Sequence, residues 1–247
     1  MSSLTDHSNE FAIHSDAFVA AIRQTDRTLW NAFELSHDIN HAVGATNLRF
    51  PKYRDGELRV SEQEARFIFV SEIAKTQLLY SVEAPTGQVY RFRGKVVERS
   101  GATDVAVLTP QFEPLVNVEF KANGYSADRK DRTSFQKDMR KLFSEPVDGC
   151  WFHTLERVNR ETLGRFWDVF KTDLRNEALK PRCAVRTTGI LLHICVLRQG
   201  VSIERRLDVV PSEISPNSLT DISSPKYSNS RSSVKVRSPE GWHITER

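Results

Sequence analysis

The sequence predicts an α/β protein with a central mixed β-sheet flanked by helices. Two observations lead to this prediction. Apolar residues recur at helical spacing in several segments, and four β-like runs follow residue 77 before helices and strands alternate. Consecutive strands favour antiparallel pairing, whereas strands joined through a helix favour parallel pairing, so both kinds of neighbour are expected in one sheet.

Length and composition agree with this class. The chain has 247 residues, of which 39% are hydrophobic and 27% charged, and this is enough to bury a core without disulfides. The three cysteines form no C-x-x-C pair, which favours a reducing compartment. The first ten residues contain no apolar run, and no apolar stretch is long enough to span a bilayer. We therefore expect a cytoplasmic protein with no membrane partner.

The first two helices are expected before the β-like runs. One extends from Asp16 to Leu35 and carries apolar residues along one side. The next begins after Ser61, which stands three residues before Glu64 in the spacing of a capping box, and it continues to about Gln77. We assign residues 1–57 to an N-terminal helical extension and residues 58–210 to the α/β core.

The remaining elements are expected in the order four strands, helix, strand, helix and two strands. Proline and glycine in Ala84–Gly87 predict a turn between the first two strands. The expected ranges are strands Leu78–Glu83, Gln88–Arg93, Ala102–Leu108 and Leu115–Lys121, helix Ser134–Ser144, strand Cys150–Leu155, helix Arg160–Leu174, and a hairpin of Gly189–Leu197 and Val201–Leu207.

The end of the chain has a different composition. Serine and proline dominate residues 211–239, and apolar residues are sparse there. From Lys226 onward the chain carries five basic and two acidic residues. We therefore expect residues 211–247 to form a disordered basic tail without a core of its own.

Two strands bring together a group of charged residues. If residues 102–108 and 115–121 form a hairpin with a loop at 109–114, Ala106 lies opposite Asn117 and Asp104 lies opposite Glu119. Directly opposed carboxylates destabilise a sheet unless a cation offsets their repulsion, and Mg²⁺ prefers carboxylate and water oxygens. Lys121 points to the same side as Glu119, because residues two apart in a strand share a face.

These residues have the types that phosphodiester hydrolysis requires. Asp104 and Glu119 are candidate ligands for Mg²⁺, for which Mn²⁺ can substitute, and a bound metal ion activates water. The Lys121 ammonium can orient that water or offset charge at the phosphate. Asp104, Glu119 and Lys121 are therefore the candidate catalytic residues. The alternative is a surface hairpin with ordinary charges.

A third carboxylate is expected near the site. Glu72 falls on the inward arc of the second helix, where burial without a partner is costly, and this makes it a candidate metal ligand. The equally open alternative places Glu72 at the edge of the helix, with its carboxylate in water. Glu83, at the end of a strand, is a further candidate for the auxiliary carboxylate.

The helix after these strands is locally basic. Residues 128–141 contain six basic and three acidic residues, and Lys and Arg contacts with phosphates supply most non-specific affinity for DNA. On the helical wheel Gln136 and Arg140 flank the apolar stripe, whereas Lys137 and Lys141 point farther outward. We take Gln136, Lys137 and Arg140 as candidate nucleic-acid-binding residues. A solvated basic face without a ligand is the alternative.

The order of these residues resembles the PD-(D/E)XK nuclease superfamily, which has the restriction-endonuclease-like fold. The matching residues, between Ser61 and Leu155, are Asp104, Glu119-Phe120-Lys121, Glu72 on the preceding helix and Gln136-Lys137-Asp138 on the following helix. Thr103 stands where the family has a proline.

The resemblance implies a mixed sheet flanked by helices and Mg²⁺-dependent hydrolysis of DNA phosphodiester bonds. It implies that Asp104 and Glu119 hold the metal, that Lys121 acts on the nucleophilic water and that Glu72 is an auxiliary ligand. The expected protein is an endonuclease of restriction, defence or mobile-element systems, with RNA as an open alternative substrate. A homodimer would suit double-strand cleavage. The alternatives are a non-catalytic nucleic-acid-binding module and a protein-interaction module on the same fold.

Overall fold

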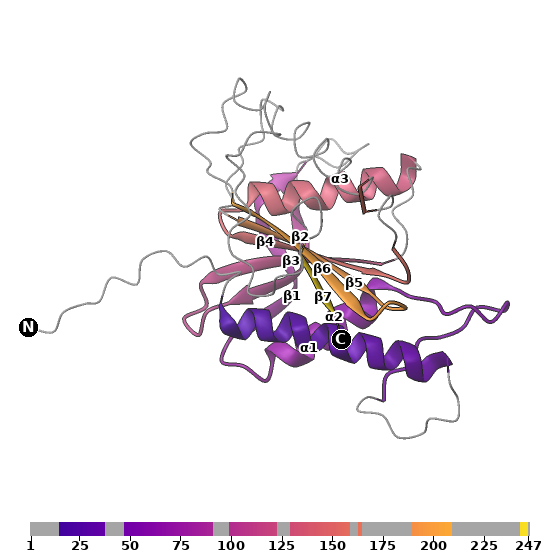
Figure 1. Ribbon diagram of the computed structural model, residues 1–247. Coiled ribbons are helices and arrows are strands. Elements are labelled where there is room, and N and C mark those ends of the chain that lie inside the picture. Colours follow the sequence, from indigo (N-terminus) through magenta and orange to yellow (C-terminus); the bar gives the residue numbers. More distant parts are fainter. Residues whose placement is uncertain are drawn as a thin grey trace, which may run out of the picture.

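A computed structural model describes residues 15–37, 47–90, 99–122, 129–158, 163–164, 189–208 and 243–246. These residues form three helices and a seven-stranded sheet whose strands follow one another in chain order (Figure 1). The helices are α1 (Asp16–His37), α2 (Glu62–Ile73) and α3 (Arg129–Ser144). The strands are β1 (Leu79–Tyr90), β2 (Arg99–Leu108), β3 (Pro114–Ala122), β4 (Asp148–Leu155), β5 (Gly189–Val196), β6 (Val201–Asp208) and β7 (His243–Glu246).

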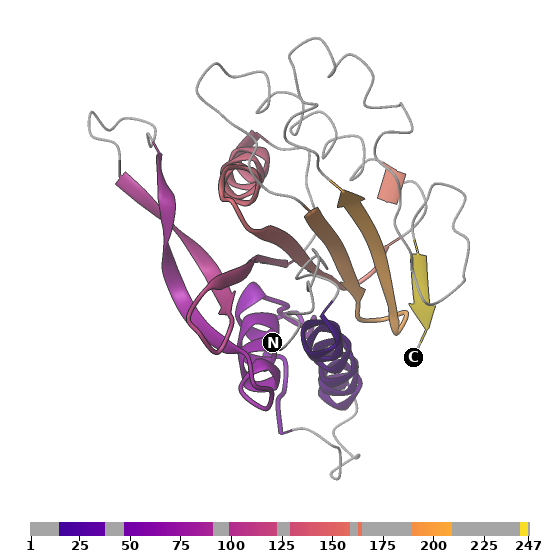
Figure 2. The same ribbon diagram turned by 90° about the vertical axis from the view of Figure 1, so that its left-hand side faces the viewer.

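The sheet is mixed, as predicted. Strands β1, β2 and β3 pair antiparallel, β3, β4 and β5 pair parallel, and β5, β6 and β7 pair antiparallel. The chain passes from β3 to its parallel neighbour β4 through α3, because such a crossover needs a long connection. Helices α1 and α2 cover one face of the sheet, and α3 covers the other (Figure 2). Within the described ranges, no helix is long and apolar enough to cross a lipid bilayer.

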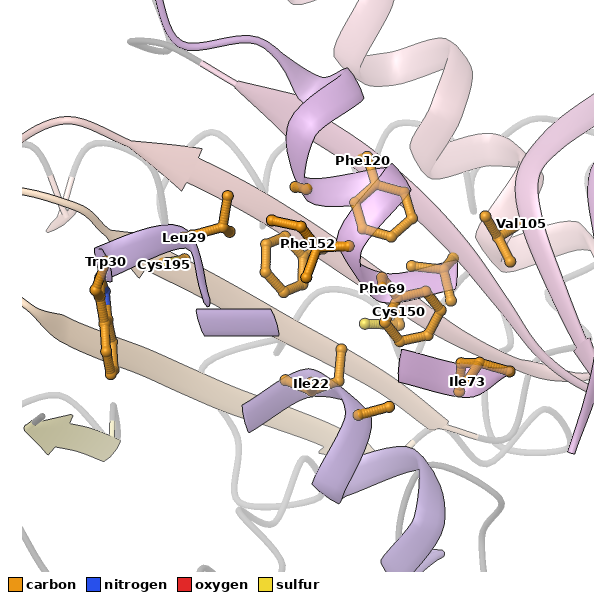
Figure 3. Packing of buried hydrophobic residues seen from close by; sticks show 14 of the residues in the cluster. Ile22, Leu29, Trp30, Phe69, Ile73, Val105, Phe120, Cys150, Phe152 and Cys195 are labelled. Atoms are coloured by element: carbon orange, nitrogen blue, oxygen red, sulfur yellow. The ribbon is translucent and has the colours of Figure 1, made fainter. Parts of the chain in front are cut away.

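The larger hydrophobic cluster lies between the sheet and helices α1 and α2. Phe69 of α2 packs against Phe120 of β3, which in turn contacts Phe152 of β4 (Figure 3). Ile22 and Leu29 of α1 belong to the same cluster. The predicted apolar side of the first helix is therefore its buried side, and α1 packs into the same core as α2.

The smaller cluster lies under α3. Met139, Leu142 and Phe143 of α3 pack with Trp151 of β4 and with residues of β5. Strands β4 and β5 are buried along their whole lengths, since they have neighbours on both sides and are covered on both faces. This is why their sequences are almost continuously apolar.

The predicted turn at Ala84–Gly87 is wrong. The chain continues through these residues as one strand, β1, which forms the edge of the sheet. An edge strand tolerates Pro85 because one side of its backbone needs no partner in the ladder. The turn residues instead produce an irregularity: Glu83 has a positive φ of 52°, and the register shifts between Pro85 and Val89.

The C-terminal part departs from the expected tail in one respect. Residues 243–246 form strand β7, which pairs antiparallel with β6 and so extends the sheet. The remainder of residues 211–247 lies outside the described residues, as does the helix expected at Arg160–Leu174 apart from residues 163–164.

A buried ionic group joins α1 to the sheet. His193 of β5 is completely buried; its Nε2 lies 2.9 Å from Oδ1 of Asp26 in α1, and its Nδ1 lies 3.0 Å from Oε1 of Glu204 in β6. Burial opposes a charged imidazole, but Asp26 and Glu204 outweigh it and raise the pKa of His193 to about 10. At neutral pH the ring is therefore a cation between two carboxylates.

We predict that His193→Leu destabilises the protein by about 3–5 kcal/mol, because it leaves the Asp26 carboxylate buried without its cation. The free energy of unfolding from urea titration measures this loss. The double variant Asp26→Leu/His193→Leu serves as the control, since removing both charges is expected to restore part of the stability. A single variant as stable as the wild type would contradict the role of the ion pair.

Stability is also expected to depend on pH through His193. The pKa of His193 is about 10 in the folded protein, whereas a histidine without these partners has a pKa of 6.5. The folded state therefore binds the proton more tightly than the unfolded state. This contribution is complete below pH 6.5 and is lost as the pH rises toward 10. Urea titrations across this range should show stability falling in the wild type and a shallower fall in the Asp26→Leu/His193→Leu variant.

Candidate functional site

The candidate site lies where β2 separates from β3. The predicted register is confirmed at Ala106 and Asn117, and the paired segment ends at Val105 and Val118. Beyond this point a side chain of β2, and not its backbone, accepts a hydrogen bond from the β3 backbone. The N–H of Phe120 donates to Oδ2 of Asp104 at 2.7 Å. The expected direct pairing of Asp104 with Glu119 is therefore absent from the ladder, because the Asp104 carboxylate binds the β3 backbone instead.

Next to this separation four side chains form what we call the acid–lysine cluster: Glu119 and Lys121 of β3, and Asp138 and Lys141 of α3. Nζ of Lys141 lies 2.7 Å from Oε1 and 2.7 Å from Oε2 of Glu119, and 2.9 Å from Oδ1 of Asp138. It also donates to the carbonyl oxygen of Ala102 in β2 at 2.8 Å. One ammonium thus connects β2, β3 and α3.

Lys121 connects the cluster to α2. Its Nζ lies 2.8 Å from Oδ2 of Asp138 and 3.6 Å from Oε2 of Glu62, the first residue of α2. The predicted capping box of Ser61 and Glu64 is present, and it fixes the start of α2 at this end of the sheet. Glu62 therefore approaches the cluster because it follows the cap directly.

Asp104 lies beside the cluster. Its negative charge favours the charged form of Lys121 and opposes ionisation of Glu119. Oδ1 of Asp104 is also 3.9 Å from Nη1 of Arg66 in α2. The three candidate catalytic residues, Asp104, Glu119 and Lys121, are thus neighbours in space.

Burial determines the protonation of the cluster. Desolvation raises the pKa of Glu119 to about 8, even though Lys141 partly lowers it. Burial opposes the charge on Asp138 too, but Lys121 and Lys141 outweigh it and lower the pKa of Asp138. The carboxylates in turn outweigh burial at both lysines and raise their pKa values. Both lysines of the cluster are therefore charged at neutral pH. Glu119 is not fully ionised there, because the neighbouring lysine does not compensate completely for the burial of its carboxyl group.

Glu72 lies in a different place. It belongs to the last turn of α2, whereas Glu62 begins that helix, and a rise of about 1.5 Å per residue separates them by about 15 Å along the axis. Oε1 of Glu72 accepts a hydrogen bond from Nζ of Lys75 at 2.6 Å. Glu72 lines a groove of about 650 Å³ between α1 and α2. Its side chain is 12% exposed and paired with Lys75, so it lies away from the cluster without being placed fully in water.

Glu83 is also outside the cluster. Its exposed side chain lies 2.5 Å from Nη1 of Arg66. Because Arg66 also approaches Asp104, its guanidinium connects Glu83 to the site. Glu62 is thus the helix carboxylate that comes near the cluster, in place of the expected Glu72 or Glu83.

Helix α3 presents its basic residues unevenly. Lys137 is exposed and Arg140 is half-buried, whereas the side chain of Gln136 lies outside the described residues. The expectation that Lys141 points outward is wrong. It is buried, because its long side chain turns back toward the sheet and meets Glu119.

Sequence reasoning missed Glu62, Asp138 and Lys141 as members of the site. The spacing of Asp138 and Lys141, three residues apart, places them on one side of a helix and is the signal that could have found them. Glu62 gave no separate signal, since acidic residues are common in the first turn of a helix for electrostatic reasons alone.

The oxygen atoms at the site are of the kind that Mg²⁺ binds. The carboxylates of Glu119 and Asp138 and the carbonyl oxygen of Ala102 converge on Nζ of Lys141, with Asp104 beside them, and oxygen is the ligand that Mg²⁺ prefers. Oε1 of Glu119 is buried and accepts no hydrogen bond, although Lys141 Nζ is 2.7 Å away. In the described part of the chain, however, no three His, Cys, Asp or Glu residues are arranged as a preformed metal centre. These oxygen atoms are chemically suited to bind Mg²⁺, and in this structure they surround the ammonium of Lys141.

Comparisons with known proteins do not assign this site. No protein-family model, curated protein or solved structure matches the chain.

We predict that Asp138→Asn lowers the free energy of unfolding by about 3 kcal/mol, because it removes the carboxylate shared by two largely buried lysines. Glu72→Gln is the matched control: its partner Lys75 is mostly exposed, so the expected loss is below about 1 kcal/mol. Urea unfolding of both variants measures the difference. Equal losses would contradict the central place of Asp138 in the cluster.

Proposed function

We propose that this protein is a metal-dependent nuclease that hydrolyses DNA phosphodiester bonds. The observation that carries the proposal is the convergence of acidic residues from two strands and two helices on one end of the sheet. The carboxylates of Glu62, Asp104, Glu119 and Asp138 come together there with the ammonium groups of Lys121 and Lys141. Such an excess of acid over base suits a divalent cation.

The arrangement of elements supports the same proposal. An acidic residue on β2, the Glu119-Phe120-Lys121 sequence on β3, a glutamate on the preceding helix and charged residues on the following helix are the pattern expected of the PD-(D/E)XK superfamily. We infer that residues 61–155 have the restriction-endonuclease-like fold. In this chain Glu62 is the helix glutamate nearest to Lys121, in place of Glu72.

The proposed roles follow from the geometry. Asp104, Glu119 and Asp138 would hold the ion through their carboxylate oxygens, and the ion would supply Lewis acidity that activates water and polarises the phosphate. Lys121 is held in its charged form by Asp138 and Glu62, which raise its pKa. The role that suits a permanently charged ammonium is stabilising negative charge as it develops on the phosphate oxygens.

The basic side of α3 would contact the DNA backbone. Lys137 is exposed on this helix, and Arg140 stands less than one turn away from it. Contacts of this kind would be independent of sequence and sensitive to salt. They supply affinity, whereas the acid–lysine cluster supplies the chemistry.

We expect plasmid DNA to be cleaved in the presence of Mg²⁺ or Mn²⁺, and Asp104→Asn, Glu119→Gln and Lys121→Met each to lower the rate by about 100-fold or more. Gel electrophoresis of the plasmid measures the rate, with single-stranded RNA tested in parallel. Glu72→Gln is the control and is expected to retain activity, since Glu72 lies at the other end of α2 from Glu62.

Cleavage that persists equally in Glu119→Gln and Lys121→Met would refute the proposed active site. Salt-sensitive DNA binding without any metal-dependent cleavage would instead favour the non-catalytic nucleic-acid-binding module. That alternative draws its support from Lys141, which already offsets the charge of Glu119 and Asp138 without a metal ion.

A further inference from the structure

The ammonium of Lys141 makes the contacts expected of a bound cation. Four oxygens from three residues lie within 2.9 Å of its Nζ: both carboxylate oxygens of Glu119, Oδ1 of Asp138 and the carbonyl oxygen of Ala102. An ammonium has three hydrogens, so it can satisfy three of these four oxygens, and Oε1 of Glu119 is the one left without a hydrogen bond. They are also the donors that a divalent ion would need at this position.

A metal ion and the ammonium cannot both occupy this position. Mg²⁺ lies about 2.0–2.1 Å from its oxygen ligands. Nζ is 2.7 Å from both Glu119 oxygens, so an ion bound to the same two oxygens would lie less than about 1 Å from the present position of Nζ. Binding of the ion between the two Glu119 oxygens therefore requires Lys141 to leave.

Glu119 needs one of the two cations. Its side chain is completely buried, and Oε1 accepts no hydrogen bond in the described structure, so the carboxylate depends on a neighbouring positive charge. Lys141 can supply that charge in the absence of metal. It can also withdraw, because its long side chain begins in the last turn of α3 and has several rotatable bonds.

We propose that Lys141 is an internal cation that holds the acidic residues together in the metal-free protein and is displaced from Glu119 when a divalent ion binds. The proposal rests on the proposed function for the identity of the ion. It adds a form of regulation to the site. Because the ion must compete with a tethered ammonium, the metal concentration at which the site is half filled is raised, and the protein stays folded without the metal.

The first test compares Lys141→Met with the wild type. Mn²⁺ affinity from electron paramagnetic resonance, measured at about pH 8.5 so that the ligands can lose their protons, should tighten on the order of tenfold, because a competing positive charge has been removed. The metal-free variant should melt at a lower temperature than the wild type and gain more from added Mn²⁺. Lys52→Met, at an exposed lysine outside the acid–lysine cluster, is the control and should behave as the wild type.

The second test uses the wild-type protein, and it decides the matter if Lys141→Met does not fold. In ¹⁵N-labelled protein the Lys141 ammonium should give a solvent-protected signal in nuclear magnetic resonance spectra. The signal is assigned by its absence in Lys141→Arg. Saturating Mg²⁺ should abolish the protection as the ammonium leaves Glu119.

An ammonium signal that stays protected at saturating Mg²⁺, or a folded Lys141→Met variant that binds Mn²⁺ no more tightly than the wild type, would overturn the proposal. These results are separable from those for the proposed function. Metal-dependent DNA cleavage with a protected Lys141 would uphold the nuclease and reject the internal cation. Displacement of Lys141 by Mg²⁺ without DNA cleavage would uphold the internal cation and reject the nuclease. If neither the wild type nor Lys141→Met bound a metal ion, both proposals would be rejected.

Discussion

The burial of Glu119 is the constraint around which this part of the molecule is arranged. Its strand, β3, has a neighbour on each side and a helix on each face, so its carboxyl group cannot reach water. Any charge there has to be balanced by another side chain or by an ion. Helix α3 brings Lys141 and Asp138 to it, and the separation of β2 from β3 leaves the Ala102 carbonyl available to the same ammonium.

Each face of the sheet buries carboxylates next to a cation, but the cation is a different residue on each face. On the α1 side, His193 is the buried cation and joins α1, β5 and β6 through Asp26 and Glu204. That group is enclosed and links elements that stabilise the fold. On the α3 side the cations are lysines, whose flexible stems begin near the surface and allow movement. The rigid ionic group and the adaptable one are thus separated by the thickness of the sheet.

Much of the fold could be predicted from the sequence, because the spacing of apolar residues along the chain indicates which side of each helix or strand is buried. The α1 stripe, the capping box at Ser61 and the pairing of Ala106 with Asn117 each depend on local pattern, and the structure confirms them. The turn expected around Pro85 failed because residue preference cannot tell a turn from an irregular edge strand. That difference is decided by the position of the strand in the sheet.

The candidate site was predictable only in part, for a related reason. Spacing along a strand places Glu119 and Lys121 on one face, but the helix partners depend on how α2 and α3 meet the sheet. Glu72 looked inward on the helical wheel, yet the start of α2, and with it Glu62, is what approaches Lys121. Lys141 looked outward because a wheel places Cβ atoms and ignores a long side chain that turns back.

The agreement between strand order and chain order has a consequence for inheritance. Because neighbours in the sheet are neighbours in the sequence, every residue of the acid–lysine cluster, together with Glu62 and Asp104, falls in one uninterrupted block from Glu62 to Lys141. Recombination at either side of that block would exchange α1 or the strands from β4 onward and leave the composition of the site intact. The acid–lysine cluster is therefore encoded by one continuous segment of the gene, while the rest of the chain supplies its support.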